Sequence, residues 1–136
     1  MNGSKIRKVF AAAVLAAMLF AWLAEPGVAY AATKDDYFDV NGERVYASLS
    51  GDANGVTGKT SYTKGPGVVE IMVNGQARIP GTSQTRDLLA MPAPVNTPGG
   101  VAGTVTPPSG YVLTSAYSLH YATIGGKSDH CEITLF

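Results

Sequence analysis

The pattern of hydrophobic and polar residues divides the chain into two parts. An uninterrupted apolar run extends from Val9 to Ala24. After Ala32 the pattern changes to short alternating segments that are separated by Gly, Asn-Gly and Pro. No window in this second part keeps apolar residues at i, i+3, i+4 and i+7 for more than about two helical turns. The sequence therefore predicts an N-terminal helical segment followed by an all-β domain, either a small antiparallel β-sandwich or a partly open barrel.

The first part has the features of a secretory signal peptide. Three basic residues, Lys5, Arg7 and Lys8, precede the apolar run, and Pro26-Gly27 follows it. Ala29-Tyr30-Ala31 then matches the A-x-A pattern that signal peptidase recognises. The run is shorter than the roughly 20 residues that a helix needs to cross a bilayer. We expect export and cleavage after Ala31, with a permanently tethered N-terminus as the alternative.

The first predicted hairpin and the main core strand lie in the N-terminal half of the β domain. Strands at 37–40 and 44–50 flank Asn41-Gly42, a dipeptide that favours a type I′ turn. In the second strand Val45, Ala47 and Leu49 alternate onto one face. Residues 68–73 form the strongest core strand, with β-branched side chains on both faces. Asn74-Gly75 predicts a second hairpin turn, with 76–79 as its return strand.

The remaining segments are less regular. Residues 56–63 are rich in threonine and predict an edge or solvent-covered strand, which Gly65-Pro66-Gly67 then ends with a turn. Six of the 8 prolines lie between residues 80 and 110. We expect a loop region there that contains one short strand at 101–106. Residues 111–124 and 131–136 predict a closing hairpin.

Composition limits the classes of function that fit the mature chain. Residues 32–136 are long enough for a single domain. They carry 7 Lys and Arg against 9 Asp and Glu, and the basic residues are scattered. This distribution argues against nucleic acid as a partner, because phosphates require a clustered basic surface. Cys131 is the single cysteine, so no intramolecular disulfide can form, as in many exported proteins of Gram-positive bacteria.

Two histidines and this cysteine are the residues that could form a nucleophile and a base. A two-residue turn at Gly125-Gly126 would place His120 directly opposite Cys131, whereas a three-residue loop would send them to opposite faces. A thiol next to an imidazole can become a reactive thiolate. However, no third residue orients the pair. We therefore expect Cys131 to be a largely buried structural thiol on the same face as Ile133 and Leu135.

An acidic segment near the start of the expected mature chain matches a calcium-binding loop only in part. Asp39-x-Asn41-Gly42 copies a fragment of an EF-hand loop. Tyr37 and Ser48 would then occupy its first and last ligand positions, where carboxylates are required. We therefore expect a solvated acidic segment, with no metal and no other cofactor bound.

Tyrosines supply the best candidate for a binding surface. Tyr117 and Tyr121 alternate with Leu119 onto one face of the predicted closing hairpin, and His130 and Glu132 share that face. Exposed aromatic strips on sheets bind sugar rings or peptides. The candidate binding residues are therefore Tyr117, Tyr121, His130 and Glu132. The alternative is that these tyrosines cover the sheet without binding a ligand.

Two resemblances bear on function. Tyr117-Ser118-Leu119-His120-Tyr121 and the segment from Lys127 to Ile133 resemble a stretch of lactococcin 972-type bacteriocins, over less than a quarter of the mature chain. Leu119 stands where that family has asparagine. The resemblance implies an exported β-sandwich that acts on the envelope of related bacteria. Gly51-Asp52, Thr57–Tyr62 and the Gly-Gly-Lys-Ser turn at 125–128 are similar to small Ser/Thr/Tyr-rich exported proteins of Gram-positive bacteria that have no assigned role.

These observations favour an exported, non-catalytic β-domain that binds a ligand at the cell surface or in the medium. We expect no stable membrane anchor once residues 1–31 are removed. A bacteriocin-like secreted toxin is the first alternative, and a Cys-His enzyme is the second.

Overall fold

The computed structural model describes residues 31–136, which form an all-β structure, as the sequence predicts. All ladders between its seven strands are antiparallel. The strands are β1 (Ala32–Val40), β2 (Glu43–Asp52), β3 (Gly55–Arg78), β4 (Thr85–Ala90), β5 (Val95–Val105), β6 (Val112–Ile124) and β7 (Lys127–Thr134). The predicted leader and its cleavage site lie outside the described residues, apart from Ala31. The described part of the chain contains no helix long and apolar enough to span a bilayer.

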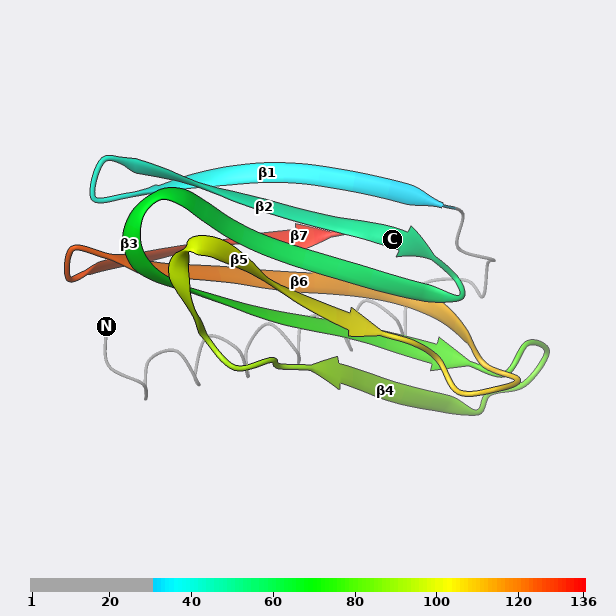
Figure 1. The fold of residues 1–136 in the computed structure, drawn as a ribbon. Helices are drawn as coiled ribbons and strands as arrows, with labels where there is room; N and C mark the ends of the chain where they lie inside the picture. The colour runs from blue at the N-terminus through cyan, green and yellow to red at the C-terminus, as the bar shows by residue number, and fades with distance from the viewer. Residues whose placement is uncertain (1–30) are drawn as a thin grey trace.

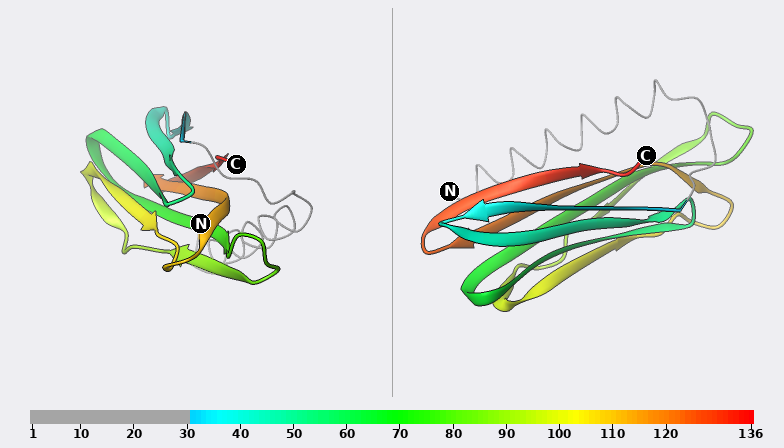
Figure 2. Two further views of the ribbon diagram at one scale, coloured as in Figure 1. Left: turned by 90° about the vertical axis from the view of Figure 1, so that its right-hand side faces the viewer. Right: turned by 90° about the horizontal axis from the view of Figure 1, so that it is seen from above.

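The sheet curls into a nearly closed barrel because β3 is long and bent (Figures 1 and 2). The order of hydrogen-bonded strands is β1-β2-β3-β6-β7, and β4 and β5 also pair with β3. The first half of β3 pairs with β2 and β5, and its second half pairs with β6 and β4. The register against β5 shifts between Tyr62 and Gly67, where the strand bends. The Gly65-Pro66-Gly67 segment thus bends β3, and the prediction that it ends a strand is wrong.

The first hairpin follows the sequence prediction closely. Asn41 and Gly42 have φ angles of 51° and 78°, which are the positive values that a type I′ turn requires. Val45, Ala47 and Leu49 are all buried on the inner face of β2. Period-two alternation is therefore sufficient to orient this part of the sheet.

Two predictions about β3 are wrong. Residues 56–63 are a central strand between β2 and β5, and they form neither an edge nor a solvent-covered strand. Asn74-Gly75 lies inside β3, paired with both β4 and β6, and makes no hairpin turn. A Cβ atom at Gly75 would lie 3.0 Å from both Leu113 Cδ2 and the Ser115 carbonyl oxygen. The glycine is therefore required for close packing of strands and not for a positive φ angle.

The proline-rich region from 80 to 110 is more regular than predicted, because it contains β4 and β5. Each of these strands pairs with β3 alone. Edge strands tolerate proline because one side of the strand makes no ladder hydrogen bonds. The short strand predicted at 101–106 corresponds to the second half of β5.

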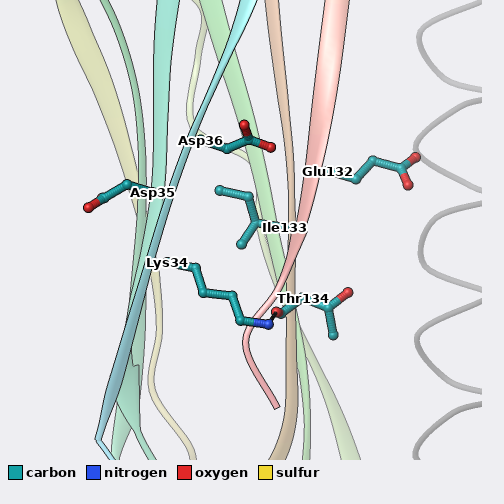
Figure 3. Close-up of a pocket in the computed structure, with 6 residues that line it drawn as sticks. All are labelled: Lys34, Asp35, Asp36, Glu132, Ile133 and Thr134. Atoms are coloured by element: carbon teal, nitrogen blue, oxygen red, sulfur yellow. Dashed lines mark hydrogen bonds between the residues drawn. The ribbon is translucent and has the colours of Figure 1, made fainter.

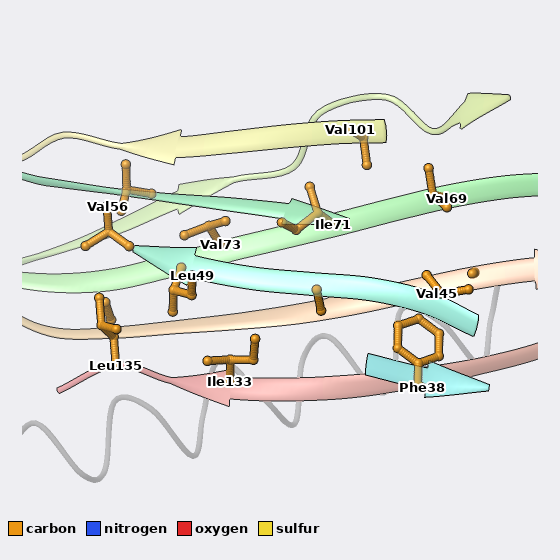
Figure 4. Packing of buried hydrophobic residues seen from close by; sticks show 14 of the residues in the cluster. Phe38, Val45, Leu49, Val56, Val69, Ile71, Val73, Val101, Ile133 and Leu135 are labelled. Carbon is orange, nitrogen blue, oxygen red and sulfur yellow. The ribbon is translucent and has the colours of Figure 1, made fainter. Parts of the chain in front are cut away.

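The core lies inside the curled sheet (Figure 4). Phe38 and Val45 pack at one end, and Val56 and Leu135 pack towards the other. Small residues allow the strands to approach one another. At Gly58, an added Cβ atom would lie 2.7 Å from the Ile71 side chain. Because the described chain has no disulfide, burial of these apolar side chains and strand pairing hold the domain together.

Candidate binding face

The hairpin of β6 and β7 places the candidate residues on opposite faces as predicted. Gly125 and Gly126 have φ angles of 58° and 77° and form the two-residue turn. The register pairs His120 with Cys131 and Tyr121 with His130. Successive side chains of a strand alternate between faces. His120 and Cys131 therefore face the core, and Tyr121 and His130 face outward.

The inner face holds a buried hydrogen-bonded histidine. His120 is fully buried, with its Nδ1 2.8 Å from Thr60 Oγ1 and its Nε2 2.7 Å from Ser118 Oγ. Thr60 Oγ1 also donates to the Glu70 carbonyl oxygen at 3.1 Å. Since a hydroxyl has one hydrogen, Nδ1 then donates to Thr60, and Nε2 accepts the Ser118 hydrogen. Both hydroxyl groups are fully buried, so this Ser-His pair acts as a structural element of the core.

Cys131 is only half-buried, although we expected it to be largely buried. It packs against the core cluster from β7, the last strand of the sheet. Burial raises the pKa of Cys131 to about 12, and the negative charges of Asp36, Glu132 and Asp129 add to this shift. A thiol with so high a pKa is a poor nucleophile at neutral pH.

The outer face brings together all four residues predicted as a binding site. Tyr117, Tyr121 and Leu119 lie on it from β6, and the register sets His130 beside Tyr121 and Glu132 beside Leu119. β3 contributes Glu70, Met72 and Asn74, paired respectively with Tyr121, Leu119 and Tyr117. We call this surface the tyrosine face. It consists of Glu70, Met72, Asn74, Tyr117, Leu119, Tyr121, His130 and Glu132.

The tyrosine face combines an apolar centre with unsatisfied polar atoms. Met72 and Leu119 are almost completely buried, and Tyr117 and Tyr121 are 7% and 3% exposed. None of these four side chains belongs to the core cluster. The hydroxyls of Tyr117 and Tyr121 and the Oδ1 atom of Asn74 are buried without a hydrogen-bond partner. Such groups are costly unless something supplies the missing hydrogen bonds.

β6 carries the centre of the tyrosine face and lies between β3 and β7 in the sheet. β6 contacts β3 and β7 at its sides and β1 and β2 across the interior. Among the described elements, none packs on its outer surface.

An apolar extension continues the face onto β4. Leu89 pairs with Asn74 and is 56% exposed, and Met91, just past the end of β4, is 53% exposed. Sequence reasoning did not include Met72, Asn74 or Leu89 in the site. Met72 lies between the β-branched core residues Ile71 and Val73. Because side chains alternate along a strand, the sequence could have placed Met72 on the opposite face.

Acidic groups dominate the charge of the tyrosine face. Burial raises the pKa of the half-buried Glu70 carboxyl. Burial also raises the pKa of Tyr117, and the negative charge of Glu132 raises it further. The three face-forming segments, 68–76, 117–123 and 128–134, contain no lysine or arginine.

A second feature is the seam where the barrel stays open, between β1 and β7 (Figure 3). Lys34 Nζ donates to the Thr134 carbonyl oxygen across it at 2.6 Å. Asp36 lies in the groove beside Ile133, whereas Glu132 points away from the seam (Figure 3). In residues 31–136 no group of three or more His, Cys, Asp or Glu side chains is placed to hold a metal ion.

A pair of exposed tyrosines occupies the outer surface of β1 and β2. Tyr37 and Tyr46 pair directly across these strands and are 51% and 55% exposed. The Arg44 guanidinium stacks 3.8 Å from the centre of the Tyr37 ring and lies 3.6 Å from Asp39. The buried polar atoms without partners are elsewhere in the described chain.

Comparisons with protein-family models, curated proteins and solved structures find no match to this chain.

Proposed function

We propose that this protein is an exported, non-catalytic β-domain that acts by binding a target at the bacterial cell surface or in the medium. The tyrosine face is its binding surface. The observation that carries the proposal is the grouping of Tyr117, Tyr121, His130 and Glu132 on one face of the β6–β7 hairpin. A bound target would contact this face at the partly exposed His130 and the exposed Glu132.

Two properties of the hairpin support binding over catalysis. The imidazole of His120 is enclosed in the core, so no substrate reaches it. The thiol of Cys131 has a raised pKa, which leaves little thiolate at neutral pH. Activity should therefore be unaffected by thiol alkylation.

The test is cosedimentation of the released protein with intact Gram-positive cells and with isolated cell walls. The variant Tyr117→Ala/Tyr121→Ala removes both rings of the tyrosine face. Tyr37→Ala/Tyr46→Ala is the matched control, because it removes two rings from the outer surface of the β1–β2 hairpin. We expect the first variant to lose binding and the control to keep it, with both retaining a sheet-type circular dichroism spectrum.

Equal binding by both variants would contradict the proposal. A killing assay on the same strains separates a harmless binder from the bacteriocin-like alternative. Killing that depends on Tyr117 and Tyr121 would identify the protein as a toxin that uses this face. Loss of activity on alkylation of Cys131 would instead support the enzyme alternative.

A further inference from the structure

We propose that the outer surface of the β1–β2 hairpin binds a second copy of this protein. The contact is isologous, which means that both copies use the same surface, and its two-fold axis runs along the hairpin between the two strands. Tyr37 and Tyr46 lie at the centre of this surface. The inference goes beyond the proposed function, because it uses neither the tyrosine face nor any of its residues.

The outer surface of the hairpin is free in the structure. Tyr37 and Tyr46 are 51% and 55% exposed, and they lie directly opposite each other on paired strands. The described elements that contact the hairpin, β3, β6 and β7, lie beside it or across the interior (Figure 1). Two adjacent exposed tyrosine rings are typical of a surface that binds another protein.

The register of the hairpin makes this surface complementary to itself. Tyr37 pairs with Tyr46 across β1 and β2, and Asp39 pairs with Arg44. A half-turn about the axis places β1 of the second copy over β2 of the first, at the same level along the hairpin. Each side chain then faces the residue that is its own cross-strand partner within one copy. Tyr37 of each copy therefore meets Tyr46 of the other, and Asp39 of each copy meets Arg44 of the other.

The charged groups beside the rings are accessible for this pairing. The side chains of Asp39 and Arg44 are 60% and 47% exposed. Within one copy they are 3.6 Å apart, which is longer than the roughly 2.7–2.9 Å of a charge-assisted hydrogen bond. The Arg44 guanidinium is held 3.8 Å from the centre of the Tyr37 ring, and its N–H groups can still donate to a second carboxylate.

The next level of the surface follows the same rule. Asp35 pairs with Ser48 on β2, and Ser48 pairs in turn with Lys59 on β3. In the dimer, Asp35 of each copy therefore lies over Ser48 and beside Lys59 of the other. Each acidic side chain of these rows is thus matched by a basic side chain of the second copy, so two copies meet without net repulsion.

A sugar is a less suitable occupant of this surface than a second copy. A sugar ring stacks on a bare aromatic face, and the Arg44 guanidinium covers a face of the Tyr37 ring. The guanidinium instead suits a partner that supplies a carboxylate beside an aromatic ring. The same surface of a second copy supplies both, as Asp39 and Tyr46.

The test is analytical ultracentrifugation of the released protein over a dilution series. We expect a dimer at high concentration that dissociates on dilution, whereas Tyr37→Ala/Tyr46→Ala should be a monomer throughout. The single variants Asp39→Arg and Arg44→Glu should each raise the dissociation constant of the dimer by about tenfold or more, because every dimer contains the reversed contact twice.

An equimolar mixture of the two single variants separates contact between copies from a defect in folding. Each variant alone places like charges opposite each other. In the mixed dimer, position 39 of each copy faces an opposite charge at position 44 of the other. The mixture should therefore dimerise about tenfold more tightly than either variant alone. Arg86→Glu, which reverses an exposed charge on β4, is the control and should dimerise as the native protein does.

Three outcomes would overturn the inference. The first is a native protein that sediments as a monomer at every concentration, which would leave this surface to a partner of different chemistry. The others are a dimer that persists in Tyr37→Ala/Tyr46→Ala and a mixture that stays monomeric. None of these results bears on the proposed function, because Tyr37→Ala/Tyr46→Ala keeps its tyrosine face and should still cosediment with cells.

Discussion

Acidification should weaken the fold through His120. Burial lowers the pKa of His120 from 6.5 to about 4, and a hydrogen bond to the Lys59 backbone and the nearby charge of Asp36 oppose this shift without cancelling it. The unfolded chain therefore takes up the proton at a higher pH than the folded chain does. The stability associated with the neutral imidazole is fully present above pH 6.5 and is lost as the pH falls towards about 4. The whole difference corresponds to about 3 kcal/mol.

The assay is urea unfolding followed by circular dichroism between neutral pH and about pH 4. The comparison variant is Thr60→Val/Ser118→Ala/His120→Leu, which removes the imidazole and both hydroxyl partners together. Replacing a whole hydrogen-bonded group with apolar residues of similar shape avoids leaving unsatisfied hydroxyls. We expect the native protein to lose about 3 kcal/mol more than the variant over this range.

Glu70 changes the stability with pH in the opposite direction from His120. Its pKa is raised by burial, so protonation of Glu70 favours the folded state and opposes the effect of His120. Because Glu70 is present in both proteins, it does not affect their difference. If the native protein and the variant respond to pH with the same slope, the reasoning about His120 is refuted.

Three further results are expected. Cys131 should react slowly with a thiol-specific dye in the native protein and rapidly in urea, because its pKa is raised to about 12, and fast native labelling at neutral pH would show an activated thiol. Glu70→Gln should raise the urea midpoint at neutral pH, since it removes a half-buried charge, and an unchanged or lower midpoint would argue against that cost. Gly58→Ala should destabilise the domain by about 1–3 kcal/mol in the same assay, because its methyl group would overlap Ile71 and Val73, whereas a neutral effect would mean that the core relaxes freely.

The elements that could be predicted from the sequence are those fixed by local chemistry. Asn41-Gly42 and Gly125-Gly126 form the expected turns, and alternation gives the correct faces of the strands beside them. The same reasoning failed at Asn74-Gly75, which has the composition of a turn. There the close approach of β6 and β4 to β3 determines the conformation, and that contact is not visible in the local sequence.

The candidate site shows the same limit. Tyr117, Tyr121, His130 and Glu132 were assigned to one face because they belong to one hairpin with a short turn. Met72 and Asn74 join them through the pairing of β3 with β6, whose register no local pattern specifies. A surface built from three strands could thus be predicted only in the part that a single hairpin contributes.

The most direct test of the binding face is hydroxyl-radical footprinting of the released protein, free and bound to cells. We predict that the partly exposed His130 is oxidised in the free protein and protected in the bound protein. Tyr37 and Tyr46 should be oxidised equally in both. Protection of Tyr37 and Tyr46 in place of His130 would contradict the account.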